Sequence, residues 1–395
     1  MRKIFYMGLE SYESRYTLQL TEWNERVFKR RGVEYEIIRG NELTTDKQIV
    51  TGSVLDAHGR TFFSLTQTAN LIKFMKEGKV TKDDIIFYED MFTPGIESLP
   101  YIMDQIPKKY RPKVFVRCLA QTIDPDDFVN REGMMRWMRY FELMVDQFIT
   151  GILVANEEMV AHLRIAGFKA PIYVTGLPFG KEEVLERVEH VKPISIRERR
   201  VAFAARFDDE KQPEFFMKLA TACYERNPDI EFAVFTGNKE LKSNNKNHTD
   251  FAKFLASSGN ANFKIYTGLT KNAYYELLSD SVVLFNCALQ DWWSNTISEA
   301  ATLGTIPLFP AYRSFPETLA NNEDLMYVPW SLNDALTKLE KIFRNPEAYN
   351  PMPLADYADQ AIDRTIDIFE GKTLDYARNG LDYRKFLATP KYSWK

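Results

Sequence analysis

Short hydrophobic runs alternate with amphipathic stretches along most of the chain. The runs KIFYMGL (3–9), DIIFYED (84–90) and KVFVRCL (113–119) have the length and apolar character of buried strands. Between them, TLQLTEWNERVFKRRG (17–32) and LTQTANLIKFMKEGK (65–79) carry apolar residues at helical spacing. Strands that alternate with helices of this length predict an α/β fold with parallel, doubly wound sheets.

The same alternation begins again in the second half of the chain. VAFAARF (201–207), IEFAVFTGN (230–238) and SVVLFNCA (281–288) predict further strands, and helical patterns separate them. A highly charged stretch lies between the two halves. The predicted organisation is a Rossmann-like domain over 1–180, a charged linker over 181–198, a second Rossmann-like domain over 199–350, and a C-terminal helical segment over 351–395 that crosses back to the first domain.

Composition and charge indicate which partners and which cellular compartment to expect for these two domains. A chain of 395 residues, 45% of them hydrophobic, is long enough for two separate cores. The net charge is −4, so no global basic field attracts nucleic acid or anionic lipid, and a polyanion site must be local. The three scattered cysteines lack metal-binding spacing, which fits a reducing compartment. Neither a signal peptide nor an apolar run of about 18 residues is found, so we predict a cytoplasmic protein without a membrane anchor.

Polar and glycine residues gather where the strands of the second half end. In open α/β sheets, ligands bind at this edge. Two cations follow the first predicted strand, glycine turns follow the next two, and LQDWWSNTISEA leads into a short helix predicted over 297–303. Possible N-caps precede that helix, and a helix N-terminus offers unpaired N–H groups to an anion. The sequence therefore predicts a diphosphate site formed by Arg206, Lys211, Gly237, Gly268, Leu269, Ser294, Asn295 and Thr296.

This half resembles the donor domain of retaining GT-B glycosyltransferases of the family-4-like group. Arg206 and Lys211 match the Arg and Lys that follow the first strand of that domain in the family. Asp291 and Glu299 match two acids at the same spacing, although the first acid is usually Glu there. The segment AATLGTIPLF is similar to the family segment EAMACGTPVI. The resemblance covers roughly 195–345 and, in the first half, only the order of strands.

The resemblance implies a GT-B fold, in which two Rossmann-like domains face a cleft, and an enzyme that transfers a hexosyl or pentosyl group with retention. The donor is a nucleotide-diphosphate sugar, expected to be a UDP-sugar, and no metal or other cofactor takes part. Glu299 would bind the donor ribose, and Asp291 would lie beside the transferred sugar. Arg206 and Lys211 would neutralise the leaving diphosphate. Trp292 either stacks on the ligand or covers the edge of the sheet.

The first half is expected to hold the acceptor. Glu89 and Asp90 end the strand DIIFY, and we predict that Asp90 orients or deprotonates the acceptor hydroxyl. Further predicted contacts are Gln121, Asp124, Arg136 and Trp137. Asp124-Pro-Asp126 has a D-x-D pattern, but Pro125 and Asp127 fit a simple turn, and no metal is predicted there.

Basic residues interleaved with aromatics in this half suit contact with phosphates and with an extruded base. They are Lys108, Lys109, Arg111, Lys113, Arg131, Arg136 and Arg139. The compact size and the acids at strand ends also resemble phage glycosyltransferases that modify DNA. We therefore predict that the acceptor is duplex DNA carrying a hydroxymethylated pyrimidine, in a host cytoplasm. The alternatives are a surface-polysaccharide or lipid-linked saccharide acceptor and, in another class, a non-catalytic protein that binds nucleotide sugars.

Overall fold

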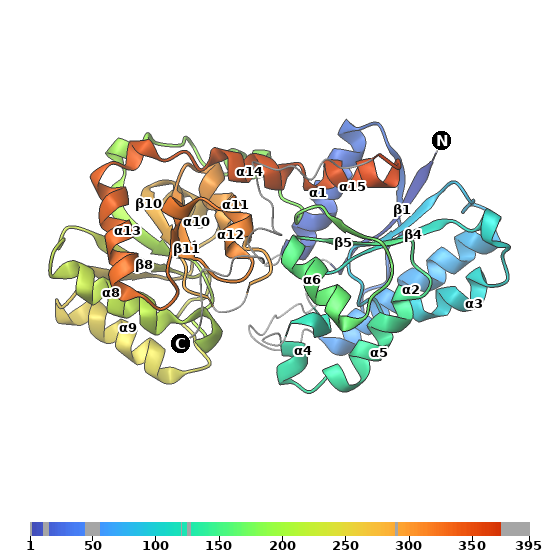
Figure 1. The fold of residues 1–395 in the computed structure, drawn as a ribbon, viewed down its shortest axis with the longest axis horizontal. Coiled ribbons are helices and arrows are strands. Elements are labelled where there is room, and N and C mark those ends of the chain that lie inside the picture. Colours follow the sequence, from blue (N-terminus) through green and yellow to red (C-terminus); the bar gives the residue numbers. More distant parts are fainter. Residues whose placement is uncertain are drawn as a thin grey trace. The chain divides into compact units, whose positions relative to one another are not determined.

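The computed structural model describes residues 2–10, 16–43, 56–119, 121–124, 128–288 and 291–372. The chain divides into two compact units (Figure 1). The first unit combines the chain up to Pro178 with a segment that begins at Gln360, and the second unit is continuous over Phe179–Asp359. Within the described ranges, no helix is both long enough and apolar enough to cross a membrane.

The first unit is built on a parallel six-stranded sheet with the order β2-β1-β3-β4-β5-β6. Its strands are β1 (Lys3–Met7), β2 (Glu34–Ile37), β3 (Ile85–Tyr88), β4 (Lys113–Arg117), β5 (Gly151–Val154) and β6 (Ile172–Val174). The central strands β3 and β5 are buried along their whole length, because helices cover both faces of the sheet.

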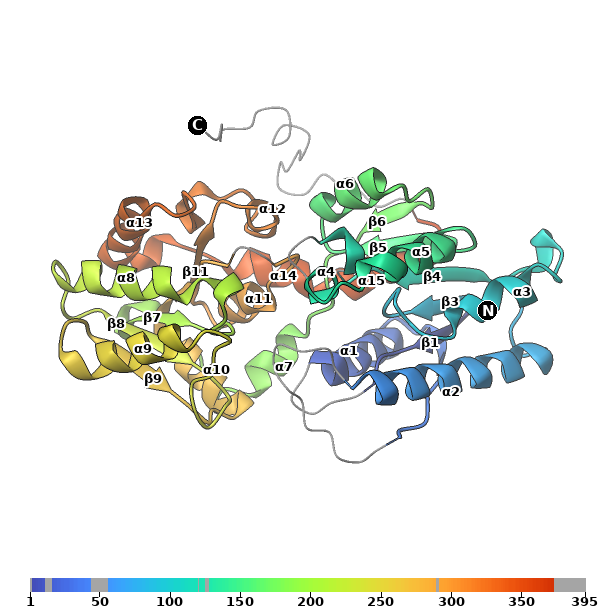
Figure 2. The ribbon, with the colours of Figure 1, turned by 90° about the horizontal axis from the view of Figure 1, so that it is seen from below.

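The helices of the first unit lie on two faces of this sheet. They are α1 (Tyr16–Arg30), α2 (Ala57–Lys76), α3 (Leu99–Met103), α4 (Phe128–Arg131), α5 (Met135–Asp146), α6 (Glu157–Ala166) and α15 (Ala361–Phe369). Figures 1 and 2 show α1 and α15 together on one face, and α2, α3 and α5 on the other. The helix predicted from residue 65 begins earlier, at Ala57, where Asp56 caps it by accepting a hydrogen bond from the His58 N–H.

The second unit contains another parallel six-stranded sheet, with the order β12-β11-β10-β7-β8-β9. Its strands are β7 (Glu198–Phe203), β8 (Glu231–Phe235), β9 (Phe263–Tyr266), β10 (Ser281–Phe285), β11 (Ile306–Pro310) and β12 (Met326–Tyr327). If β7 is counted as the first strand, this is the order 3-2-1-4-5-6 of dinucleotide-binding Rossmann folds.

The helices of the second unit are α7 (Lys181–Glu186), α8 (Pro213–Tyr224), α9 (Lys246–Ser258), α10 (Lys271–Ser279), α11 (Asn295–Thr302), α12 (Phe315–Thr318), α13 (Leu332–Arg344) and α14 (Met352–Asp359). Helix α8 packs against α9 and α13, whereas α11 packs against α10, α7 and α14. The segment predicted as a linker, 181–198, therefore begins with a helix that packs inside this unit. Of the predicted C-terminal segment, α14 belongs to the second unit and α15 to the first, and residues beyond 372 lie outside the described ranges.

Each sheet has one point at which the strand order reverses. In the first unit this point lies between β1 and β3, and in the second it lies between β7 and β10. Loops at the carboxyl ends of two such strands diverge to opposite faces of the sheet and leave a crevice between them. A functional site is therefore expected among the residues that follow these four strands.

Candidate functional site

The segments that follow β7 and β10 bring a lysine and an aspartate together in the second unit. After β7 the chain makes the short 3-10 helix η5 (Asp209–Lys211), and Gln212 then adopts a left-handed conformation (φ 48°) before Pro213 starts α8. This turn leaves Lys211 largely buried, with its Nζ 3.9 Å from Asp291 Oδ2. Both residues were predicted for the donor site, and the structure brings their side chains together.

Arg206 lies on the same loop, and acids of that loop balance its charge. Its Nη2 is 2.6 Å from Glu210 Oε1, and its Nη1 is 3.7 Å from Asp208 Oδ2. The side chain is 37% exposed, so the guanidinium is accessible to a ligand. An anion at this place would have to compete with Glu210 for the guanidinium.

The start of α11 lies directly after Asp291. The helix begins at Asn295, two residues before the predicted start, and Ser294 is its N-cap. The Ser294 hydroxyl bonds to the Thr296 hydroxyl at 2.8 Å, and the Ser294 side chain does not cap the backbone N–H groups of the first turn. The Asn295 Oδ1 is buried and accepts no hydrogen bond from any described residue. The first turn of α11 thus keeps polar groups available for a ligand.

The two tryptophans of this segment are both buried. The Arg313 guanidinium lies 4.7 Å from the centre of the Trp292 ring, and the Trp293 ring lies 6.2 Å from that of Tyr357 on α14. Only 4% of Trp292 and 8% of Trp293 is exposed. Of the two roles considered for Trp292, this arrangement favours covering the edge of the sheet over stacking on a ligand.

Glu299, one turn into α11, receives hydrogen bonds from three side chains of α10. Lys271 Nζ donates to Oε1 at 2.6 Å, Tyr275 donates to the same oxygen at 3.0 Å, and Tyr274 donates to Oε2 at 2.7 Å. Burial and the Glu299 charge together raise the pKa of both tyrosines, which therefore stay protonated donors. These three residues were not predicted from the sequence. The only available signal was their i, i+3, i+4 spacing in KNAYY, after the glycine turn of Gly268.

The predicted glycine turns hold two neighbouring loops against each other. After β8 and β9, the Gly268 N–H donates to Asn238 O at 2.7 Å, and the Leu269 N–H donates to Thr236 O at 3.2 Å. A Cβ at Gly237 would lie only 3.3 Å from Leu269 O, so the absence of a side chain permits this close approach. Gly268 has φ +65°, which glycine adopts without strain.

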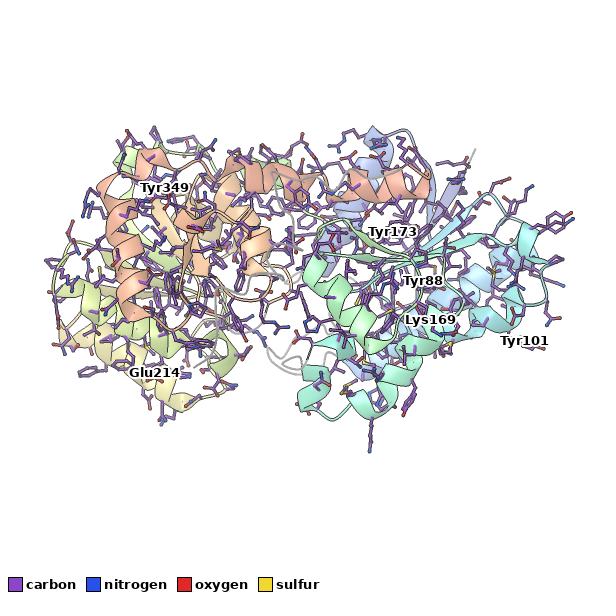
Figure 3. All side chains as sticks on the ribbon, in the orientation of Figure 1. Tyr88, Tyr101, Lys169, Tyr173, Glu214 and Tyr349 are labelled. Carbon is purple, nitrogen blue, oxygen red and sulfur yellow. The ribbon has the colours of Figure 1, made fainter. Side chains whose placement is uncertain are left out.

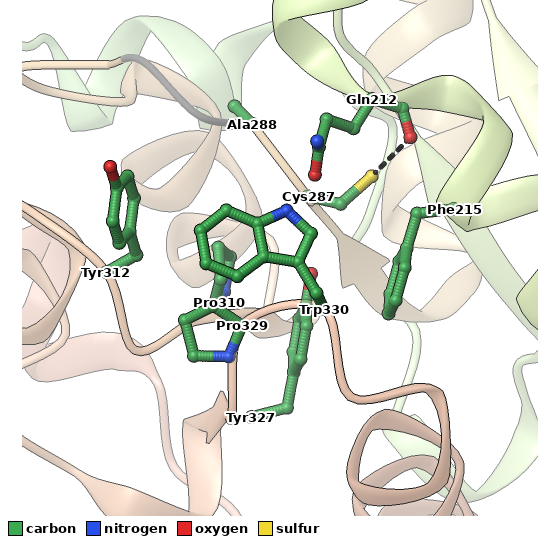
Figure 4. Close-up of a pocket in the computed structure, with 9 residues that line it drawn as sticks. All are labelled: Gln212, Phe215, Cys287, Ala288, Pro310, Tyr312, Tyr327, Pro329 and Trp330. Atoms are coloured by element: carbon green, nitrogen blue, oxygen red, sulfur yellow. Dashed lines mark hydrogen bonds between the residues drawn. The ribbon is translucent and has the colours of Figure 1, made fainter. Parts of the chain in front are cut away.

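Behind Lys211, a pocket opens at the ends of β10, β11 and β12 (Figure 4). Its lining is Gln212, Phe215, Cys287, Ala288, Pro310, Tyr312, Tyr327, Pro329 and Trp330. The Cys287 thiol donates to Gln212 O at 3.1 Å, as the dashed line in Figure 4 shows. The cavity volume is about 10 Å³, which is room for about one water molecule. This pocket is too small to hold a sugar ring.

In the first unit, Arg60 joins two acids at the switch point between β1 and β3. Its Nη2 is 2.5 Å from Asp90 Oδ2 and its Nη1 is 3.2 Å from Glu10 Oε1. The same Nη2 donates to Phe92 O at 2.8 Å. Burial lowers the pKa of Arg60, but the charges of Asp90 and Glu10 outweigh burial and raise it above its ordinary value. Asp90 is thus held in place by Arg60 at the edge where an acceptor is expected.

Glu89, which was predicted beside Asp90 as an acceptor contact, lies in the core. Its Oε1 is 2.7 Å from Arg117 Nε, and both side chains are fully buried. Its Oε2 accepts from Asn24 at 3.2 Å. Successive residues at a strand end point to opposite sides, so Glu89 and Asp90 face different surroundings. In this position Glu89 forms a structural ion pair instead of a ligand contact.

A further acid, Glu142 on α5, lies near Asp90 and was not predicted from the sequence. It accepts from the Thr122 N–H at 3.1 Å and from the Thr122 hydroxyl. Burial, with a contribution from the Asp90 charge, raises the pKa of Glu142 to about 7. Thr122 belongs to the 3-10 helix η3 (Gln121–Ile123), and the next residue, Asp124, is fully buried. Residues 125–127, with Asp126 of the D-x-D pattern, lie outside the described ranges.

The predicted basic residues fall at two separate places. Trp137 on α5 is 43% exposed, and its ring lies 5.8 Å from that of Phe92, so it is near the Asp90 end of the sheet, with exposed Arg136 beside it. By contrast, the 3-10 helix η2 (Lys108–Tyr110) precedes β4 and lies at the opposite, amino-terminal edge. Tyr101 on the preceding α3 is exposed on this side of the unit, whereas Tyr88 lies in the sheet (Figure 3).

Two of the predicted basic side chains bond to main-chain oxygens of the protein. Arg111 Nε donates to Ile106 O at 2.7 Å, and Arg139 Nη2 donates to Ala166 O at 2.8 Å. Each guanidinium therefore has fewer donors left for a phosphate. Lys108 and Lys109 remain exposed.

The fold of this chain is similar to those of known protein structures, whereas its sequence has low identity to theirs. No protein-family model and no curated protein matches the chain. Sucrose-phosphate synthase from Thermosynechococcus elongatus aligns over 98% of this chain and 100% of its own, with 11% identity and a TM-score of 0.59. HepE from Anabaena, in complex with UDP, aligns over 94% and 100%, with 10% identity and a TM-score of 0.59. Trehalose-6-phosphate synthase OtsA aligns over 94% and 100%, with 10% identity and a TM-score of 0.62. At this identity the likeness concerns the fold, and it confirms the predicted GT-B fold.

Proposed function

We propose that the protein is a glycosyltransferase that takes its sugar from a nucleotide-diphosphate sugar bound to the second unit. One observation carries the proposal. At the β7/β10 switch point of a sheet with Rossmann order, Lys211 lies beside Asp291, and the uncapped start of α11 follows with Glu299 one turn inside. A cation and helix N–H groups suit a diphosphate, and the two carboxylates suit sugar and ribose hydroxyls.

Each residue of the donor site has a role that follows from its chemistry. Lys211 and Arg206 neutralise charge that grows on the diphosphate as the glycosidic bond breaks, which lowers the barrier without a metal. Glu299 accepts hydrogen bonds from the nucleotide ribose, and Asp291 accepts them from the transferred sugar. A UDP-linked donor is supported by the Anabaena HepE complex, which contains UDP. Retention of configuration is proposed from the resemblance of the Asp291–Glu299 segment to retaining enzymes.

The acceptor is proposed to bind the first unit near Asp90. The Asp90 carboxylate lies 2.5 Å from the Arg60 guanidinium, which holds it in a fixed orientation. Its role is therefore to orient the acceptor hydroxyl. Trp137, exposed and in contact with Phe92, offers an aromatic face close by.

Duplex DNA with a hydroxymethylated pyrimidine remains the first acceptor class that we propose. Exposed Arg136 and Trp137 near the Asp90 edge support it, because phosphate contact and base stacking need such residues. The occupied guanidinium groups of Arg111 and Arg139 reduce this support. A saccharide acceptor has separate support, since two proteins of the same fold are named as synthases of sucrose phosphate and trehalose 6-phosphate.

The test is a transfer assay with a panel of acceptors. The protein is incubated with UDP-sugars and with duplex DNA containing hydroxymethylcytosine, plain duplex DNA, free hexoses or hexose phosphates. Release of UDP is measured, and products are identified by mass. We expect UDP release that depends on one acceptor class and is lost in Lys211→Ala. Binding of UDP without transfer or hydrolysis would support the non-catalytic alternative, and absence of both would contradict the proposed function.

A further inference from the structure

The Glu299 carboxylate has little hydrogen-bonding capacity left. A carboxylate has about four lone-pair positions. Lys271 and Tyr275 use two of them on Oε1, and Tyr274 uses one on Oε2. A ribose presents two neighbouring hydroxyls, both of which are donors toward a carboxylate. The proposed nucleotide partner therefore needs at least one position that the protein itself occupies.

All three occupants come from one face of α10. Lys271, Tyr274 and Tyr275 stand at positions i, i+3 and i+4, which places them on the side of the helix that meets α11. Thr270 caps the helix by accepting from the Ala273 N–H at 3.2 Å, so the first turn is fixed. The ammonium of Lys271 also lies 5.1 Å and 4.7 Å from the ring centres of Tyr274 and Tyr275.

The three donors differ in how readily they can leave. Tyr275 is 1% exposed, and the partly buried Tyr274 ring lies 5.2 Å from that of Tyr275 and 6.4 Å from that of Phe235, so both rings are held by packing. The Lys271 side chain is 40% exposed and ends in a flexible ammonium group. Ion pairs with an exposed partner contribute little to stability, because water solvates the released ammonium well. Lys271 is the one occupant that a ligand can displace without disturbing the core.

We propose that Lys271 occupies the place of a nucleotide hydroxyl on Glu299, and that donor binding displaces it. This inference rests on the proposed function, because it takes Glu299 as the ribose partner. Lys271 thereby lowers the affinity for the nucleoside part of the donor. Once released, its charge stays at the same end of α10, and it favours a ligand that carries a diphosphate over the nucleoside alone. Lys271 is a specificity-determining residue of the donor site and takes no part in the chemical step.

Calorimetric titration of three probes tests this exchange. Uridine, 2′-deoxyuridine and UDP are titrated into the wild-type protein and into Lys271→Met, which keeps the length of the side chain and removes its charge. We expect the affinity for uridine to rise about threefold to tenfold in Lys271→Met. For 2′-deoxyuridine, which lacks one of the two hydroxyls, the increase in affinity should be smaller. For UDP, the increase should be cancelled in part, because the variant loses the attraction between the lysine charge and the diphosphate. Lys271→Arg should weaken uridine binding, because a guanidinium forms a bidentate pair with a carboxylate and is harder to displace.

Lys264→Met is the matched control. Lys264, on β9 of the same unit, is also half exposed and pairs with a different glutamate, Glu231, at 2.5 Å. Its replacement should leave all three affinities unchanged. If UDP binds the wild type but uridine binds Lys271→Met no more tightly than the wild type, the exchange is wrong while the donor site stands. If the wild type binds neither UDP nor uridine at millimolar concentration, the proposed function falls together with this inference.

Discussion

At the scale of single residues, Glu142 links the stability of the first unit to pH. Burial and the Asp90 charge raise the pKa of Glu142 from its ordinary value of 4.5 to about 7, while the Thr122 hydrogen bonds oppose the shift. Between these two values the folded protein keeps the proton and the unfolded chain releases it. The unfolded state then binds fewer protons, so the free energy of unfolding falls as pH rises through this window.

Glu142→Gln should remove this dependence, because the amide keeps an oxygen for the Thr122 N–H and carries no charge. We expect the variant to be more stable than the wild type at pH 8 by about 3 kcal/mol, and by less than about 1 kcal/mol at pH 5. Urea unfolding at both pH values measures the difference. An equal difference at the two pH values would contradict a titrating Glu142.

Lys211 and Arg206 lead to a prediction about turnover. Because their charges act on a diphosphate whose charge grows in the transition state, Lys211→Ala should lower kcat about 10²-fold to 10³-fold and change donor affinity less. Arg206→Ala should act in the same direction more weakly, since Glu210 already shares its guanidinium. Initial rates and UDP titration measure the two effects. Lys218→Ala is the control, because Lys218 is an exposed lysine of α8 that pairs with Glu214 in the same helix. Turnover of Lys211→Ala at the wild-type rate would refute its role.

At the scale of elements, α15 completes the core of the first unit from the far end of the chain. The Phe369 ring lies 5.2 Å from that of Phe87 on β3 and 4.8 Å from that of Phe115 on β4. On the outer side, Arg30 at the end of α1 pairs with Asp363, and Arg31, directly after α1, bonds to Asp363 at 3.0 Å and to Asp367 at 2.8 Å. The helix is thus tied to the sheet by apolar packing and to α1 by ion pairs.

Phe369→Ala should therefore destabilise the first unit. Deleting a buried phenylalanine leaves a cavity between the two rings, and the expected loss is about 3 to 5 kcal/mol in the free energy of unfolding. Denaturant unfolding measures it. The nearby Lys372→Ala, which removes an exposed side chain, should cost less than about 0.5 kcal/mol. A loss of that smaller size in Phe369→Ala would mean that α15 does not pack on the sheet in solution.

Elements with a clear hydrophobic pattern could be predicted from the sequence. Elements that are fixed by contacts between residues far apart in the chain could not. The strands β3, β4 and β10 contain the apolar runs IIFY, VFV and VVLF, because helices cover them on both sides. The start of α2 was missed because an aspartate cap, not periodicity, sets it. The burial of Glu89 could not be predicted, because an acid at a strand end can point to either side. The donors around Glu299 lie 24 to 28 residues away, and only tertiary structure brings them together.

At the scale of the whole molecule, a net charge of −4 leaves DNA binding to local groups. If DNA is the acceptor, Arg136→Ala should weaken binding and reduce the slope of log K against log salt concentration by about 0.9, the contribution of one phosphate contact. Replacing Lys108 and Lys109, at the opposite edge of the sheet, should affect transfer less. Fluorescence anisotropy over a range of NaCl concentrations measures both. If the wild type shows no DNA binding at low salt, the saccharide acceptor takes the place of DNA.

The place of α15 also sets the order in which the molecule is assembled on the ribosome. Within the described residues, the second unit is the continuous stretch Phe179–Asp359, whereas the first unit is completed by a segment that begins at Gln360. At about 5 to 20 residues per second, the roughly 180 residues that separate Pro178 from α15 take about 10 to 40 s to synthesise. During that interval Phe87 and Phe115 lack their aromatic neighbour Phe369. They then form an exposed hydrophobic patch on the nascent chain. The first unit is therefore completed only after Phe179–Asp359 of the second unit have been synthesised, and until then its exposed aromatic face is where a chaperone would be needed.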